Sequence, residues 1–249
     1  MKRLLALLIA AAGLGCLVGL VGCGALQRKF LFFPSHHNYN NGLSAWKKEG
    51  RIIGYAREVA APENVWLVLH GNGGQASDRV YALPCFSTND SVFIMEYPGY
   101  GAREGKPSKA SFDAAAAEAY QLLRKTHPKT PICLVGESIG TGPASALANR
   151  SPAPDKIVLV VPFDKLARVA AHHFPYLPVS LILEANWDNV HALSVYKGRV
   201  EIFGALEDTI IPIAHAKTLA GSLPGAKFHP IAGGHNDWAS PGRVEIRNP

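Results

Sequence analysis

One serine lies in a sequence pattern that supports nucleophilic chemistry. Residues 136–140 read Gly-Glu-Ser-Ile-Gly, a G-x-S-x-G pattern centred on Ser138. An apolar run at 131–135 precedes it, and an alanine-rich helical pattern begins at Ile139. This pattern needs a buried strand that turns sharply into a helix, because a strained turn between small residues presents the hydroxyl above the sheet edge. We therefore predict that Ser138 is a nucleophile rather than a plain helix N-cap.

His235 is the histidine best placed to act as a base for this serine. A serine hydroxyl near neutral pH needs a base, which in turn needs a carboxylate to fix its tautomer. His235 follows the last strand-like run in a Gly-Gly-His-Asn sequence (233–236), where glycines allow a sharp turn. His70 also follows a strand-like run, but its place at the strand end favours bracing of the next loop over direct catalysis.

Asp208 is the predicted carboxylate partner of His235. It lies in the loop after a strand-like run at 200–203, and His235 follows the next such run. A carboxylate after the penultimate strand can reach a histidine after the last strand, in the chain order serine, acid, histidine. Two competitors remain open: Glu207 is adjacent in sequence, and Asp164 follows the strand-like run at 157–161.

A glycine-rich loop after the run at 65–69 is the candidate oxyanion loop. Residues 70–74 read His-Gly-Asn-Gly-Gly, and such small residues let backbone amides approach a substrate carbonyl. We predict that the amides of Asn72 and Ile139 hold the oxyanion, with Gly73 as the alternative to Asn72. The loop fits neither G-x-G-x-x-G nor the Walker pattern, which argues against a phosphate site.

Strand-like and helical patterns alternate along the chain. The short apolar runs lie at 51–60, 65–69, 92–95, 132–135, 157–161, 200–203 and 227–231, and the helical patterns at 111–125, 139–149 and 213–223. This alternation predicts an α/β fold with a mostly parallel central sheet and helices on both faces. Residues 164–194 interrupt it, and we expect either a small cap over the carboxyl edge of the sheet or an ordinary crossover with irregular flanks. Three aromatic residues there could line an acyl pocket or belong to the core: Phe174, Tyr176 and Trp187.

The first 23 residues read as a targeting sequence. Lys2 and Arg3 precede an apolar run at 4–22. Residues 20–23, Leu-Val-Gly-Cys, resemble the bacterial lipobox, in which the signal is cut before a cysteine that is then diacylated. The resemblance implies a signal peptide at 1–22, lipidation of Cys23 and a domain at 23–249. An uncleaved transmembrane anchor is the alternative, because the run is just long enough to span a bilayer.

Either reading places the folded domain in the bacterial cell envelope, facing the periplasm or the exterior, with the inner or outer membrane left open.

Hydrophobic residues make up 48% and charged residues 18% of the chain, which is typical of a globular protein. The formal charge of +6 is scattered, so we predict no nucleic-acid partner. We predict no metal or cofactor, because the H-E-x-x-H and paired-cysteine patterns are absent. A disulfide between Cys85 and Cys133 stays open.

Five motifs in order resemble those of the α/β-hydrolase superfamily. They are residues 70–73, 96–101 with 105–108, 136–140, 204–212 and 234–236. The more detailed similarity is to small serine-aminopeptidase-like hydrolases, a group that includes membrane-anchored depalmitoylases. The resemblance implies the α/β-hydrolase fold and a Ser-His-Asp acyl-enzyme mechanism. The chain departs from the pattern at Glu137 and Ile139, which flank the serine, and in having only 237–249 where relatives usually add a helix.

Together these features predict a serine hydrolase that cleaves a carboxylic ester or thioester. A membrane-tethered enzyme would meet acyl lipids or acylated proteins. One alternative is a serine aminopeptidase, which would need an acidic group such as Glu137 or Glu184 to hold the substrate amine. The other is a catalytically inactive envelope lipoprotein that uses the fold as a binding scaffold.

Overall fold

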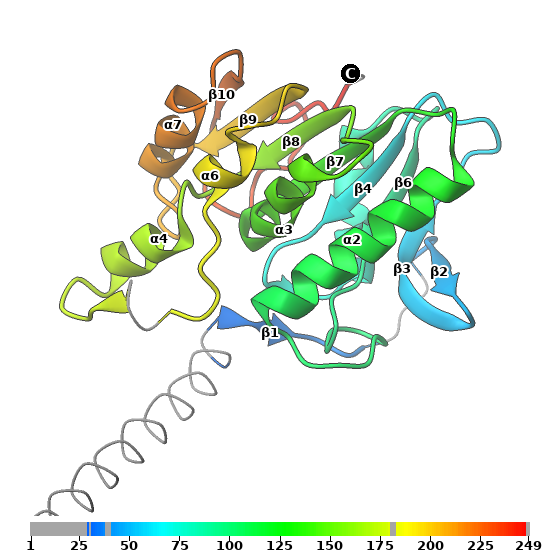
Figure 1. Cartoon of the computed structure of the whole chain (residues 1–249), viewed down its shortest axis with the longest axis horizontal. Coiled ribbons are helices and arrows are strands. Elements are labelled where there is room, and N and C mark those ends of the chain that lie inside the picture. The colour runs from blue at the N-terminus through cyan, green and yellow to red at the C-terminus, as the bar shows by residue number, and fades with distance from the viewer. Residues whose placement is uncertain (1–28, 30, 38–40, 180–182, 248–249) are drawn as a thin grey trace, which may run out of the picture.

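An eight-stranded sheet forms the centre of the molecule (Figure 1). The computed structural model describes residue 29 and residues 31–37, 41–179 and 183–247. The strands run in the order β10-β9-β8-β7-β4-β6-β3-β2; pairs from β10 to β6 are parallel, and those that join β6, β3 and β2 are antiparallel. Their bounds are β2 Ser44–Lys48, β3 Arg51–Arg57, β4 Val65–Leu69, β6 Ser91–Met95, β7 Ile132–Glu137, β8 Lys156–Val160, β9 Arg199–Ala205 and β10 Lys227–Ile231.

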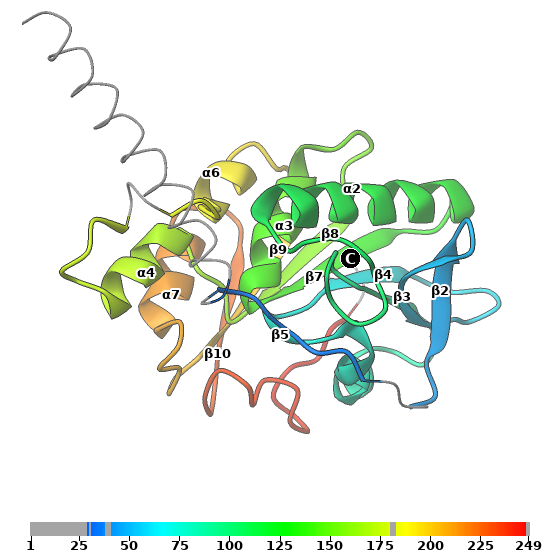
Figure 2. The same ribbon diagram turned by 90° about the horizontal axis from the view of Figure 1, so that it is seen from below.

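Helices and a C-terminal segment cover the two faces of the sheet. In Figure 2, α2, α3 and α6 lie over one face, while η1 and the C-terminal segment lie over the other. The bounds are η1 Ala76–Cys85, α2 Lys109–Thr126, η2 Ser138–Gly140, α3 Thr141–Ala146, η3 Leu147–Asn149, α4 Leu166–His173, α6 Asn189–Leu193 and α7 Ile213–Gly221. The predicted fold class, a mostly parallel sheet with helices around it, is confirmed.

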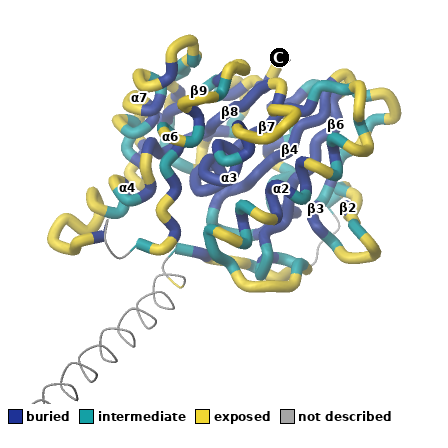
Figure 3. The backbone as a smooth tube through the Cα atoms, in the orientation of Figure 1, coloured by how far each residue is buried: buried dark blue, intermediate teal, exposed yellow. Residues whose placement is uncertain are grey.

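Strand β4 shows how the sheet divides the interior into two cores. Val65, Leu67 and Leu69 belong to the core under α2 and α3, while Trp66 and Val68 point into the core on the other face. Because both faces are covered, every residue of the strand is buried, which explains its continuous apolar sequence (Figure 3).

The second core is closed by the end of the chain without a helix. Trp238, Val244 and Ile246 are buried there, and the Ile246 amide donates to the Cys85 carbonyl at 2.8 Å. Cys85 and Cys133 are separate buried thiols, and burial raises the pKa of Cys133 to about 12.

Several elements differ from the sequence prediction. Helix α2 begins at Lys109 rather than at 111, because the Ser108 hydroxyl accepts the Ser111 amide as its N-cap. The helix predicted at 139–149 is divided into η2, α3 and η3. Strand β2 and helix η1 were not predicted. In the edge strand β2 only Trp46 is buried, so the sequence carries no clear apolar alternation.

The described part of residues 164–194 includes two short helices, α4 and α6, and an exposed stretch at 174–178 that follows α4. Figures 1 and 2 both place α4 beside α7, and α6 returns to the sheet face next to α3. Among the residues that the structure describes, no helix combines the length and apolar character that a membrane span needs. The predicted signal peptide at 1–22 and the predicted lipidation site Cys23 lie outside the described residues.

Candidate active site

Ser138 lies in a strained turn between β7 and η2. Its backbone φ is +53°, a left-handed conformation that side-chain-bearing residues rarely adopt. The glycines around it are required by close approach. A Cβ on Gly140 would lie 2.0 Å from the Leu69 carbonyl oxygen, and one on Gly136 would lie 2.7 Å from Thr141 Cα. The G-x-S-x-G pattern therefore reflects the packing of this turn against β4 and α3.

Three side chains that are distant in sequence form one hydrogen-bonded chain. His235 Nε2 lies 2.9 Å from Ser138 Oγ, and His235 Nδ1 lies 2.7 Å from Asp208 Oδ2. An ionised carboxylate only accepts hydrogen bonds, so Nδ1 carries the proton and Nε2 is free to accept the serine proton. Both Ser138 and Asp208 are buried. This arrangement can transfer a proton away from the serine hydroxyl.

Asp208 is held by the loop between β9 and α7. Its second oxygen, Oδ1, accepts the amides of Ile210 and Ile211 at 2.9 and 2.8 Å. Glu207 is exposed, and among the described residues its carboxylate makes no hydrogen bond to His235. The structure thus brings Asp208, and not its sequence neighbour, to the imidazole.

Asp164 belongs to a different Asp–His pair. Its Oδ1 lies 2.7 Å from His215 Nδ1 on α7, and it also contacts Arg168 and the Lys165 amide. Burial alone would raise the pKa of Asp164, but the hydrogen bonds from His215 and Lys165 outweigh it, so the pKa lies below the ordinary aspartate value. Sequence reasoning missed His215, which lies near the start of α7 with no motif around it.

The glycine loop borders the serine as the sequence predicted. Gly71, Asn72, Gly73 and Ser138 line one cavity. Within the described ranges, the backbone N–H groups of Asn72 and Ile139 donate no hydrogen bond. Ile139 is the second residue of η2, and its side chain packs in the core. Unpaired amides beside a nucleophile can donate to a developing oxyanion.

His70 braces the loop from inside the protein. The ring is fully buried, its Nδ1 lies 2.7 Å from the Gly71 carbonyl, and its Nε2 lies 3.5 Å from Glu96 Oε1. It also packs on Tyr97, with ring centroids 4.5 Å apart. No hydrogen bond links it to Ser138 in the described structure, so its geometry agrees with bracing rather than direct catalysis.

Comparison with known proteins identifies the fold. No family model matches the chain. The Pyrococcus furiosus esterase Pf2001 superposes with a TM-score of 0.62 at 13% identity, over 84% of this chain and 91% of the esterase. A bromoperoxidase from Bacillus anthracis superposes with a TM-score of 0.59 at 16% identity, over 80% and 94%.

Relatives found by sequence similarity include a protein named as an alpha/beta hydrolase. The Caenorhabditis elegans alpha/beta hydrolase domain-containing protein aho-3 is 31% identical over 179 residues, 69% of this chain and 52% of its own length. The Danio rerio lysophosphatidylserine lipase ABHD12 is 29% identical over 188 residues, 66% and 48%. The chain belongs to the α/β-hydrolase superfamily.

The relatives differ in how much of their length the chain spans. An uncharacterized Mycobacterium tuberculosis protein is 28% identical over 260 residues, which cover 95% of this α/β-hydrolase and 90% of the relative. By contrast, the chain spans only about half the length of the two animal proteins.

A buried ion pair between Glu137 and Arg79 supports the glycine loop of this α/β-hydrolase. Glu137, directly before Ser138, accepts the Gly71 amide at 3.1 Å and lies 3.2 Å from Arg79 Nε. Tyr81 donates to the same carboxylate at 3.3 Å, and Arg79 also donates to the Gly73 carbonyl. Sequence reasoning missed Arg79 and Tyr81, because both lie on η1, which has no clear helical periodicity.

Electrostatics keep Glu137 ionised inside the protein. Burial alone would raise the pKa of Glu137, but the charge of Arg79 and the Gly71 amide outweigh it, so the pKa lies below the ordinary glutamate value. Glu137 raises the pKa of Arg79 against the effect of burial. Both partners are therefore charged, and the carboxylate is fully engaged within the protein.

We expect Glu137→Gln to lower the free energy of unfolding by about 3 kcal/mol at pH 7, because it leaves the buried Arg79 guanidinium without its counter-charge. The folded-state pKa of Glu137 lies below its unfolded value, so its stabilisation is complete above the unfolded pKa and is lost as pH falls through the folded pKa. Urea unfolding of both proteins across pH 3–7 measures whether the difference narrows in acid.

Glu207→Gln is the matched control for this prediction, because it makes the same chemical change at an exposed site. Its unfolding free energy should stay within about 0.5 kcal/mol of the wild type. A Glu137→Gln protein as stable as this control at pH 7 would contradict the stabilising role of the ion pair.

The cavity beside Ser138 has a volume of about 470 Å³. Tyr81 and Ile210 contribute apolar surface, while the glycine loop and His235 supply the polar surface. The three aromatic residues proposed from the sequence lie elsewhere: Phe174 and Tyr176 are exposed, and Trp187 is buried and donates to Asp113. In the part of the chain that is described, no three His, Cys, Asp or Glu side chains cluster as a metal site requires.

Proposed function

We propose that the chain is a serine hydrolase that cleaves a carboxylic ester or thioester through an acyl-enzyme on Ser138. The observation that carries this proposal is the hydrogen-bonded chain from Ser138 Oγ through His235 to Asp208, which borders an open cavity. A serine that is buried in a strained turn and bonded to a fixed imidazole is the arrangement that nucleophilic catalysis requires.

The proposed reaction follows from the positions of these atoms. Ser138 Oγ attacks the carbonyl carbon while its proton moves to His235 Nε2. The carbonyl electrons move onto oxygen, and the amides of Asn72 and Ile139 stabilise that oxyanion, each by about 3–4 kcal/mol. The tetrahedral intermediate expels the alcohol or thiol, which takes the proton from Nε2. A water molecule then attacks the carbonyl carbon of the acyl-enzyme while its proton moves to His235 Nε2. The proton passes on to Ser138 Oγ as the carboxylic acid leaves.

Two observations favour an acyl ester or thioester over an aminoacyl substrate. An aminopeptidase needs a free carboxylate for the substrate amine, but Glu137 is engaged by Arg79, Tyr81 and Gly71. Glu184 lines a different cavity from the one that contains Ser138. The name of one relative, a lysophosphatidylserine lipase, agrees with ester cleavage.

The N-terminal sequence supports a location for this activity. The lipobox-like residues 20–23 favour lipidation of Cys23 and anchoring in the bacterial cell envelope, with the catalytic domain facing the periplasm or the exterior. An enzyme held there would act on acyl lipids or acylated proteins. Its finer relationship is to serine-aminopeptidase-like and depalmitoylase-like hydrolases.

A substrate series tests the reaction class. We expect the purified full chain in detergent to hydrolyse p-nitrophenyl esters and acyl-thioesters of increasing chain length, and to be inactive on aminoacyl-p-nitroanilides. Because the leaving groups are chromogenic, kcat/KM is measured for each substrate under the same conditions. Preferential cleavage of the nitroanilides would support the aminopeptidase, and no turnover of any substrate would support a binding scaffold.

A further inference from the structure

The segment that follows the leader runs directly along the glycine loop. We call residues 31–36 the strap. Its strand β1 (Phe33–Pro34) pairs in parallel with β5 (Gly73–Gly74), immediately after Asn72. The Phe33 amide donates to the Asn72 carbonyl at 3.0 Å, and the Ser35 amide donates to the Gly74 carbonyl at 2.9 Å. Figure 2 shows the strap crossing the molecule beside the loop labelled β5.

Asn72 is held by contacts on both its backbone and its side chain. Its side-chain Nδ2 donates to the Leu31 carbonyl at 2.9 Å. Its backbone carbonyl accepts the Phe33 amide and also the Tyr100 hydroxyl, the latter at 2.8 Å. The Asn72 carbonyl belongs to the peptide between Asn72 and Gly73, and the Asn72 N–H belongs to the preceding peptide. The contacts therefore fix Asn72 through its carbonyl and its side chain and leave its N–H for the substrate.

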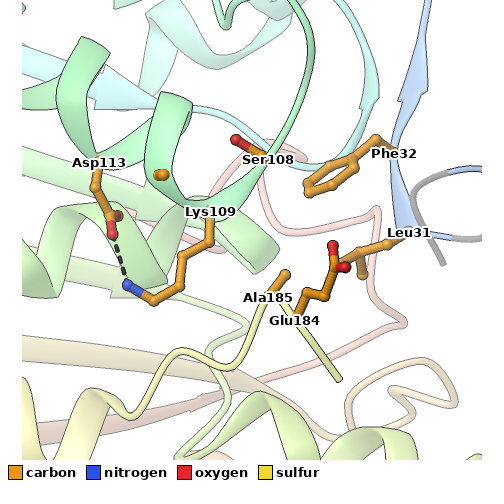
Figure 4. Close-up of a pocket in the computed structure, with 8 residues that line it drawn as sticks. Leu31, Phe32, Ser108, Lys109, Asp113, Glu184 and Ala185 are labelled. Carbon is orange, nitrogen blue, oxygen red and sulfur yellow. Dashed lines mark hydrogen bonds and ion pairs between the residues drawn. The ribbon is translucent and has the colours of Figure 1, made fainter. Parts of the chain in front are cut away.

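The strap is itself fixed to the folded domain. Phe32 is buried, and its ring centroid lies 5.0 Å from that of Phe112 on α2. Figure 4 shows Phe32 and Leu31 on the wall of a cavity of about 440 Å³ beside the start of α2. The Ser35 carbonyl accepts the Gly101 amide at 2.9 Å. These contacts give the strap a defined position against which the glycine loop can be held.

A loop built of glycines needs such a partner. Gly71, Gly73 and Gly74 have no side chains to pack, and glycine has the largest conformational freedom of any residue. An oxyanion donor is effective only when it is held in place, because an error of about 1 Å in positioning can cost roughly 100-fold in rate. Arg79 and Glu137 hold one side of this loop, and the strap holds the other.

We propose that the strap is a positioning element of the oxyanion hole: the Phe33 amide and the Leu31 carbonyl hold the carbonyl and the side chain of Asn72, and so orient the residue whose N–H is the proposed donor. The proposal rests on the proposed function, since it requires a reaction with an oxyanion. It makes the residues that link the leader to the domain part of the catalytic geometry, acting through Asn72 rather than touching substrate.

Proline at position 33 tests the proposal in the full chain. Phe33→Pro removes the N–H that donates to Asn72, and Phe33→Ala removes the same exposed side chain but keeps the N–H. We expect Phe33→Pro to lower kcat for a p-nitrophenyl ester by about tenfold or more with little change in KM, because oxyanion donors act in the transition state. Phe33→Ala should keep the wild-type kcat and KM.

A second variant removes the other contact between the strap and Asn72. Asn72→Ala keeps the proposed backbone donor but removes the Nδ2 bond to Leu31. We expect its kcat to fall as well. The Phe33→Pro/Asn72→Ala double variant should lose less than the product of the two single effects, because both substitutions release the same residue, Asn72. The melting temperature of Phe33→Pro shows whether that variant folds. If it does not fold, the kcat of Asn72→Ala decides the outcome.

The outcomes separate this inference from the proposed function. If folded Phe33→Pro has the kcat of Phe33→Ala, or if only KM changes, or if Asn72→Ala retains the wild-type kcat, the strap does not position the oxyanion hole, although the hydrolase stands. If the wild type fails to react with a fluorophosphonate probe and turns over no ester, the proposed function itself fails.

Discussion

Alanine in place of Ser138 is expected to lower kcat for the best acyl ester about a million-fold, the loss typical of removing a catalytic nucleophile. Without the hydroxyl, no acyl-enzyme forms and His235 Nε2 has no proton to accept from residue 138. Only the oxyanion donors and substrate binding would remain to assist the attack of water. Initial rates at saturating substrate measure the loss, and a fluorophosphonate probe reports the nucleophile independently of substrate choice.

Ser145→Ala is the matched control for this substitution. Ser145 is fully buried on α3, and its hydroxyl has no hydrogen-bond partner among the described residues, so its removal should change neither kcat nor labelling. Probe labelling that persists in Ser138→Ala would show that another residue is the nucleophile, and the assignment would be wrong.

Asparagine in place of Asp208 is expected to lower kcat by about four orders of magnitude with little change in fold. The amide has no charge to stabilise the imidazolium, and its NH₂ group can hold His235 in the wrong tautomer. The loop amides of Ile210 and Ile211 can still donate to the side-chain oxygen, so the loop should keep its shape. Single-turnover acylation, followed with an ester that releases nitrophenol, measures the effect on the first chemical step.

Asp164→Asn makes the same substitution in the other Asp–His pair. Asp164 contacts His215 and Arg168 and has no contact with His235 in the described structure, so the variant should lose stability but keep kcat within a few-fold of the wild type. A larger kcat loss in a folded Asp164→Asn than in Asp208→Asn would reverse the assignment of the acid.

The sheet explains how three distant loops bring Ser138, Asp208 and His235 together. Ser138 follows β7, Asp208 lies in the loop after β9, and His235 lies in the loop after β10. These strands are parallel, so their carboxyl ends lie at the same edge, where α/β proteins place their ligands. The strap reaches that edge from outside the sheet and pairs with the glycine loop after β4.

The sequence by itself determined the elements whose pattern is local. Strands β4 and β10 have the bounds that the sequence predicted. For β4 the reason is that a strand covered on both faces needs a continuous apolar segment. The turn at Ser138 was also visible in the sequence, because small residues must flank a strained residue. The edge strand β2 and the helix η1 lacked such local signals and were missed.

The tertiary structure alone decided which partner each charged or polar group has. Glu207 and Asp208 are adjacent in sequence, yet only Asp208 reaches His235, because the loop after β9 turns one carboxylate inward and leaves the other in solvent. The contacts of Arg79 with Glu137 and of Leu31 with Asn72 join segments that are far apart in the chain. No local periodicity encodes such contacts, because they exist only after the sheet has brought its strand ends and the strap together.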